Sequence, residues 1–143
     1  MIEIAREKLA EDPRENLTFE TGTAESLAET VAGRFDVVLG FNYLHLVADP
    51  ARTLASVHQL LKPGGHFVSK TGCLKEMNPL IGIAIPLLRL FGRAPATVLR
   101  LDTQMIEGAL QAAGFEIEVN ERHGSGSRDA RPFIVACRKA RHD

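Results

Sequence analysis

The sequence predicts an α/β domain whose sheet is mostly parallel and ends in an antiparallel pair of strands. Residues 35–70 follow a strand–helix–strand pattern, which makes the two strands parallel neighbours. Apolar strand patterns recur at 115–119 and 133–137 with no helical pattern between them, so these two strands should pair antiparallel. A chain of 143 residues with 45% hydrophobic content fits a single domain over 1–143.

The strand–helix–strand unit has clear local signals. Val37–Leu39 is a continuous apolar run with β-branched residues, which suits a strand covered on both faces. Asp49 is a good N-cap and Pro50 a good first helical residue, so a helix should begin at residue 50. Pro63–Gly65 ends that helix in a tight turn before a strand at 66–70.

The flanking segments complete the expected order of elements. Residues 2–9 have helical spacing, and Leu17–Thr21 alternates as a short strand. Asp102 should cap a further helix that ends at Gly114.

Composition excludes several classes of partner. A formal net charge of -1 without a dense basic run gives no electrostatic footprint for nucleic acid. Cys73 and Cys137 lack metal-ligand spacing in the sequence, so we expect bystander thiols and no metal. The first residues lack the apolar run of a signal peptide, and we expect a cytoplasmic protein.

The loop and turn around this helix resemble a known enzyme family. Phe35-Asp-Val-Val-Leu-Gly-Phe-Asn-Tyr-Leu-His, Asp49-Pro50 and Leu61-Lys-Pro-Gly-Gly are together similar to the middle of a class I S-adenosylmethionine-dependent methyltransferase. The resemblance implies a Rossmann-like sheet in the order 3-2-1-4-5-7-6, with the first two strands and the glycine-rich cofactor loop missing here. Our first hypothesis is therefore an N-terminally truncated product or fragment. We expect residues 1–143 to bind S-adenosylmethionine more weakly than a longer chain.

The resemblance also implies a cofactor site. Gly22, Thr23 and Ala24 match the segment that contacts adenine, although Thr23 stands where the family has an acid and brings no charge. Gly40, Phe41 and Asn42 would line the methionine and sulfonium side, at the carboxyl end of the Phe35 strand. Both segments could instead be ordinary turns.

His45 is the candidate catalytic residue. It lies in the loop beyond the Phe35 strand, and imidazole can accept a proton near neutral pH. An acceptor hydroxyl that loses its proton during methyl transfer would need such a base. The alternative is a structural histidine that caps the loop or packs under the next apolar segment.

Residues 74–100 match the variable cap segment of the family. Met77–Phe91 is the most apolar stretch, but nearby charges and its prolines make it too short to span a bilayer. It could form core helices, a lipophilic acceptor pocket, a homodimer face or a shallow membrane contact.

The main hypothesis is S-adenosylmethionine-dependent methyl transfer to a small-molecule or lipophilic acceptor, as in the quinone-biosynthesis and phospholipid methylases that the pattern resembles. The alternative is a non-catalytic or degenerate partner of the same fold that uses residues 80–91 for assembly.

Overall fold

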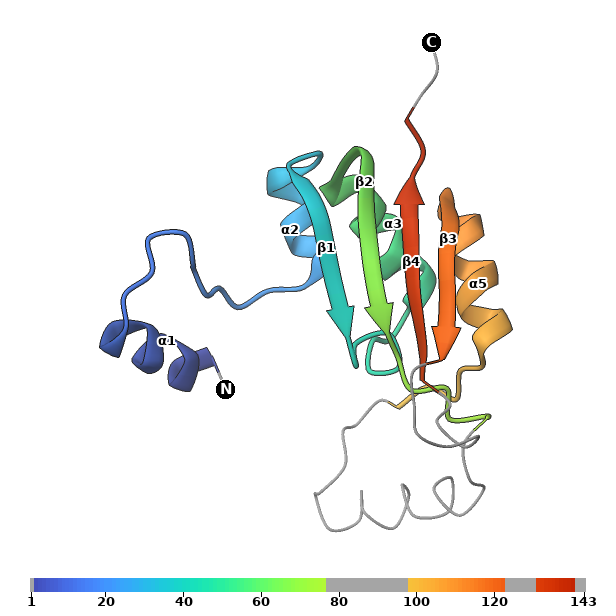
Figure 1. The fold of residues 1–143 in the computed structure, drawn as a ribbon, viewed down its shortest axis with the longest axis horizontal. Coiled ribbons are helices and arrows are strands. Elements are labelled where there is room, and N and C mark those ends of the chain that lie inside the picture. The colour runs from blue at the N-terminus through green and yellow to red at the C-terminus, as the bar shows by residue number, and fades with distance from the viewer. Residues whose placement is uncertain (1, 77–97, 123–130, 141–143) are drawn as a thin grey trace.

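A computed structural model describes residues 2–76, 98–122 and 131–140 of the chain (Figure 1). The described helices and strands are, in chain order, α1 (Ile2–Glu11), α2 (Ala24–Val31), β1 (Phe35–Phe41), α3 (Pro50–Leu60), β2 (Leu61–Lys70), α5 (Thr103–Ala112), β3 (Phe115–Arg122) and β4 (Pro132–Arg138). The four strands form one sheet in the order β1-β2-β4-β3. β1 and β2 are parallel, whereas β4 is antiparallel to both β2 and β3. The predicted mixed sheet is therefore confirmed.

The strand–helix–strand unit forms as its capping residues predict. α3 begins at Pro50, and the Asp49 carboxylate accepts a hydrogen bond of 3.1 Å from the Arg52 N–H. The turn after α3 lies within the β1–β2 ladder, because Phe35 pairs with Leu61 and Val37 pairs with His66. Residues 62–65 therefore loop out between the two pairs.

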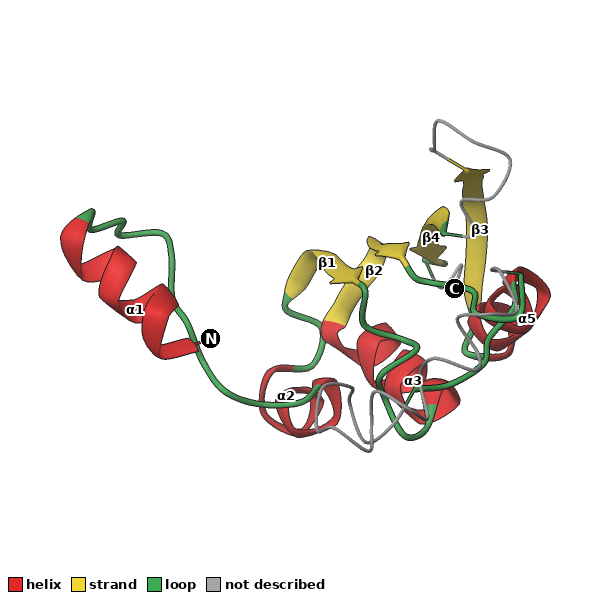
Figure 2. Cartoon of the chain, turned by 90° about the horizontal axis from the view of Figure 1, so that it is seen from below, coloured by secondary structure: helices red, strands yellow, loops and turns green. Residues whose placement is uncertain are grey.

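The core lies between the sheet and its helices. α2, α3 and α5 all lie on one face of the sheet (Figure 2). Leu54 and Val57 of α3, and Leu110 of α5, are at most 2% exposed and belong to one buried cluster with Phe67 of β2. Leu101 and Ile106, on either side of the Asp102 cap of α5, belong to the same cluster. This agrees with a hydrophobic staple at the start of the helix.

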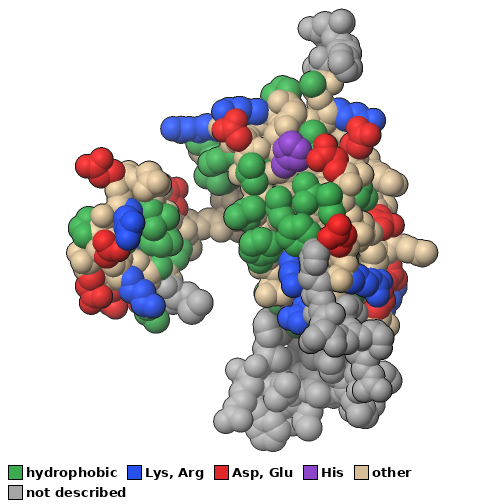
Figure 3. Space-filling model, in the orientation of Figure 1, with side chains coloured by type: hydrophobic (Ala, Val, Ile, Leu, Met, Phe, Trp, Pro, Cys, Tyr) green, Lys and Arg blue, Asp and Glu red, His purple; other side chains and the backbone are tan. Residues whose placement is uncertain are grey.

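The opposite face of the sheet, here called the open face, is not covered by any described helix. Val37, Leu39 and Phe41 of β1 point to it and are 51%, 62% and 54% exposed. Figure 3 shows apolar side chains gathered on this face, with acidic groups and a histidine beside them. The prediction that β1 is covered on both faces is therefore wrong for the described residues.

Two further expectations differ from the structure. Leu17–Thr21 is not a strand: it belongs to the link from α1 to α2, and no described strand pairs with it. Its alternating pattern is insufficient because a strand needs a neighbour to satisfy its backbone. The Arg6 guanidinium instead donates to the Phe19 carbonyl, at 3.0 Å from Nη2. α2 was not expected, although Thr23 and Ser26 form a capping box at its start.

Other expected features lie outside the described residues. Residues 77–97 include the Leu80–Phe91 segment, so the structure describes only the two ends of the predicted cap, 74–76 and 98–100. In the described part of the chain, no helix has the length and apolar character to cross a membrane.

Shortening a buried side chain of the core should destabilise the domain. Leu110→Ala removes a fully buried side chain from α5 and should lower the free energy of unfolding by about 2–5 kcal/mol. Met105→Ala, on the same helix but with Met105 46% exposed, should change it by about 0.5 kcal/mol or less. Urea denaturation followed by circular dichroism measures both. Equal losses in the two variants would contradict the described packing of α5.

Candidate functional site

A cavity of about 560 Å³ lies between the start of α2 and the carboxyl half of β1. Its size is typical of sites that hold small molecules. It brings together two segments that were expected to meet a cofactor, Gly22–Ala24 and Gly40–Phe41. The other lining residues are Glu20, Thr21, Ser26, Leu27, Thr30, Val38, Leu39, Tyr43, Val57, Leu60 and Phe67.

The end of β1 is shaped by an unusual backbone conformation. Asn42 has a φ of 51°, in the left-handed region that asparagine tolerates better than most residues. Its N–H still donates to the Lys70 carbonyl at 2.8 Å, so the ladder with β2 continues to this residue. Asn42 follows the cavity-lining residue Phe41 but does not line the cavity.

Gly40 is required by packing as well as by its place in the cavity. A Cβ atom at this position would lie 2.9 Å from Cε2 and Cζ of the Phe67 ring. The ring is 1% exposed and packed in the core, so a side chain at residue 40 would have to displace it. The absence of a side chain at residue 40 therefore has a structural cause that does not require a ligand.

Thr23 has a defined structural task in the capping box of α2. Its Oγ1 accepts from the Ser26 N–H at 3.2 Å, and the Thr23 N–H donates to Ser26 Oγ at 3.0 Å. The hydroxyl that was expected to face adenine is thus already engaged at the helix start. Any ligand contact by Gly22–Ala24 would rely mainly on their backbone groups.

A polar cluster beside the cavity was missed by sequence reasoning. The buried Thr53 hydroxyl donates to Glu25 Oε1 at 2.6 Å, and this hydrogen bond is the main reason that the pKa of Glu25 lies below its usual value. Burial and then the charge of Glu25 raise the pKa of Tyr43. Tyr43 therefore presents a protonated phenol at neutral pH. The available signals were a polar Thr53 inside an apolar helical stripe and the single tyrosine of the chain.

His45 lies in the loop after β1 and does not line the cavity. Its Nδ1 atom is buried and has no hydrogen-bond partner among the described residues. Burial lowers the pKa of the imidazole, which favours the neutral form near pH 7. The His45 carbonyl accepts from the Leu99 N–H at 2.8 Å, so the loop is joined to the segment before α5.

Parts of the chain are similar in sequence to known methyltransferases. Residues 1–67 match a family model described as a methyltransferase domain. The ubiquinone biosynthesis O-methyltransferase of Pseudomonas aeruginosa is 45% identical over 49 residues, which are 34% of this chain and 21% of that protein. The demethylmenaquinone methyltransferase of Lactococcus lactis is 28% identical over 148 aligned positions, covering 89% of this chain and 56% of that protein. The chain therefore spans between about a fifth and about half of these relatives.

Solved structures agree on the fold. An S-adenosylmethionine-dependent methyltransferase from Mesorhizobium loti superposes with a TM-score of 0.75 at 24% identity, covering 94% of this chain and 75% of that one. An O-methyltransferase family protein from Burkholderia thailandensis gives 0.71 at 19% identity, covering 96% and 41%. These superpositions show that the chain has the fold of S-adenosylmethionine-dependent methyltransferases.

Proposed function

We propose that this chain belongs to an enzyme that transfers a methyl group from S-adenosylmethionine to a small-molecule or lipophilic acceptor. The observation that carries the proposal is the cavity in which Gly22–Ala24 meets Gly40–Phe41, within a methyltransferase-type sheet. Ligands of open α/β sheets bind beyond the carboxyl ends of the strands. The names of the two curated relatives, which refer to ubiquinone biosynthesis and to demethylmenaquinone, support the choice of acceptor class.

The cavity has properties that suit the cofactor. Leu27 and Val38 offer apolar contacts for a flat ring, and Glu20 offers a carboxylate that could accept from sugar hydroxyls. Gly22 leaves its backbone accessible next to these groups. Gly40 and Phe41 would face the methionine end, and Asn42 would follow them just outside the cavity lining. When bound, the cofactor supplies an electrophilic methyl group on its sulfonium.

The chain's own residues would align the reactants and limit access of water. Methyl transfer depends mainly on such positioning, and less on covalent help from the protein. Tyr43 would contribute a neutral phenol to the wall of the cavity. His45 would accept the proton of an acceptor hydroxyl through a neutral imidazole, and its lowered pKa, which favours the proton-accepting form near pH 7, supports this role.

A second candidate function is a non-catalytic partner of the same fold. The exposed apolar side chains of Val37, Leu39 and Phe41 favour it, because contiguous apolar surface often marks an interaction site. A cytoplasmic location is part of both candidates. Cys73 and Cys137 are free thiols, as a reducing compartment favours.

Filling the cavity should weaken cofactor binding. Thr30 lines the cavity from α2, so Thr30→Trp should raise the dissociation constant of S-adenosylhomocysteine at least about tenfold, or 1.4 kcal/mol. Glu29→Trp is the matched control, because the exposed Glu29 is its neighbour on the same helix and does not line the cavity. Isothermal titration calorimetry measures both. Equal affinities, or no saturable binding by the unaltered chain, would contradict the proposed site.

Loss of the His45 imidazole should slow methyl transfer to a hydroxyl. In the active protein, His45→Gln should lower turnover by about a hundredfold or more with a hydroxylated quinone-ring acceptor, while leaving cofactor affinity unchanged. Because burial lowers the pKa of His45, the unaltered enzyme should lose activity only as the pH falls below about 6.5. A pH profile of turnover measures this limb. Wild-type turnover in the variant across pH 6 to 9 would make His45 a structural residue.

A further inference from the structure

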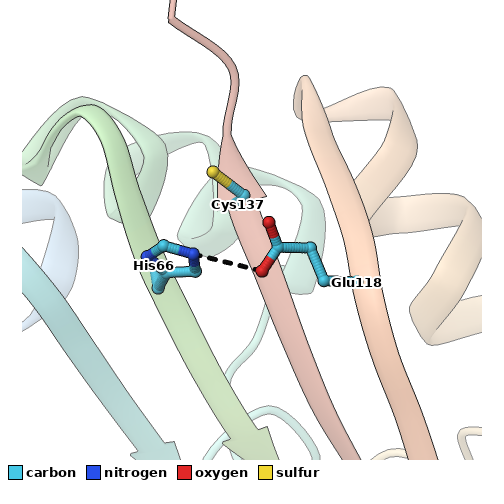
Figure 4. A group of neighbouring side chains, drawn as sticks. All are labelled: His66, Glu118 and Cys137. Carbon is cyan, nitrogen blue, oxygen red and sulfur yellow. Dashed lines mark hydrogen bonds and ion pairs between the residues drawn. The ribbon is translucent and has the colours of Figure 1, made fainter.

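Three adjacent strands bring a histidine, a carboxylate and a thiol together on the open face. His66 comes from β2, Cys137 from β4 and Glu118 from β3 (Figure 4). Their ligand atoms all lie within 4.8 Å of one another. Because the three residues are far apart in the sequence, no motif could have indicated this cluster. The cavity residues are different, so the cluster is independent of the proposed methyl-transfer site.

Strand register explains why these side chains meet. His66 and Cys137 are direct partners across β2 and β4, on the same side of the sheet. The β3–β4 ladder shifts between Ile117 and Val119, which leaves Glu118 as an extra, unpaired residue of β3. Such bulges commonly redirect a side chain. Here the bulge carries a carboxylate whose Oε2 lies 3.1 Å from His66 Nε2.

The nitrogen–oxygen separation in the cluster is close to an edge of a metal coordination polyhedron. Tetrahedral Zn²⁺ with nitrogen, oxygen and sulfur ligands has ligand–ligand separations of about 3.3–3.6 Å, given its bond lengths. The nitrogen–oxygen separation of 3.1 Å already approaches such an edge. The Cys137 Sγ needs to approach by about 1 Å, which a side-chain rotation can supply. Its present contact is a weak hydrogen bond of 3.5 Å to the Arg138 carbonyl.

The ligand chemistry selects the type of ion. A thiolate and an imidazole disfavour Mg²⁺ and Ca²⁺, which take oxygen ligands, and favour Zn²⁺. One carboxylate and one thiolate would neutralise its double charge, with the thiol proton released to solvent on binding. The geometry points to a Zn²⁺ site formed by His66, Glu118 and Cys137, with a water as the fourth ligand.

The surroundings of the cluster allow an ion to enter from solvent. The His66 and Glu118 side chains are 38% and 46% exposed, so an ion can reach them from solvent. Val68 and Val135, the partnered residues one open-face position along β2 and β4, provide an apolar border on one side. The metal would tie β2, β4 and β3 together on the side where no described helix packs.

Cobalt(II) replacement tests the site in the untagged, reduced full chain. We expect one Co²⁺ per chain, with a thiolate-to-cobalt charge-transfer band that stoichiometric Zn²⁺ removes. Cys137→Ser should abolish the band, and His66→Gln or Glu118→Gln should weaken Co²⁺ binding at least about tenfold. Zn²⁺ should also raise the melting temperature of the unaltered chain and leave that of Cys137→Ser unchanged.

Two control variants separate this site from incidental binding. Cys73→Ser should retain the band, because Cys73 lies in the buried core and is not part of the cluster. Burial also raises the pKa of the Cys73 thiol to about 11, which disfavours a thiolate ligand. Glu116→Gln should retain the affinity, although Glu116 is the register partner of Cys137 on the same strand as Glu118. Circular dichroism without metal confirms that each variant folds. A band that persists in Cys137→Ser, no band in the unaltered chain, or equal loss in Glu116→Gln and Glu118→Gln would overturn the proposal.

Discussion

The contact between the Phe67 ring and the backbone at Gly40 is the constraint on which both the sheet and the cavity depend. Phe67 is nearly fully buried in the core and lies at a ring-centroid distance of 6.1 Å from Phe115. It also lines the cavity, so one side chain links the packing of α3 and α5 to the shape of the candidate site. Any side chain at residue 40 would displace this ring. The proposed site and the core therefore cannot vary independently.

Local signals predicted the elements whose formation needs only neighbouring residues. Asp49 with Pro50 and Asp102 each set a helix start, and the crossover through α3 made β1 and β2 parallel. The strand at Leu17–Thr21 was wrong because strand formation depends on a partner elsewhere in the chain. Within the site, the two glycine-containing segments line the same cavity, and their contact with a cofactor stays a prediction. The Glu25–Thr53 bond and the His66 cluster could not be predicted, since each joins residues from separate elements.

The two faces of the sheet have different roles in this description. α2, α3 and α5 cover one face of the sheet (Figure 2), where the buried cluster lies. The cavity lies between α2 and β1. The open face combines exposed apolar side chains of β1 with the polar cluster of His66, Glu118 and Cys137 (Figure 3). A metal at the polar cluster and a cofactor at the cavity would contact different residues of the same sheet. Their effects on stability can therefore be measured separately.

The position of β4 between β2 and β3 imposes an order on folding. β1, α3 and β2 are contiguous in the chain, so they can pair while synthesis continues. The edge of β2 that faces away from β1 stays unpaired until residues 133–137 emerge, more than sixty positions later. β3 is made earlier but joins the sheet only through β4. During that interval the nascent chain has a half-formed sheet with an unpaired edge and apolar residues on β1 and β2. Such an intermediate is prone to aggregation or to chaperone binding.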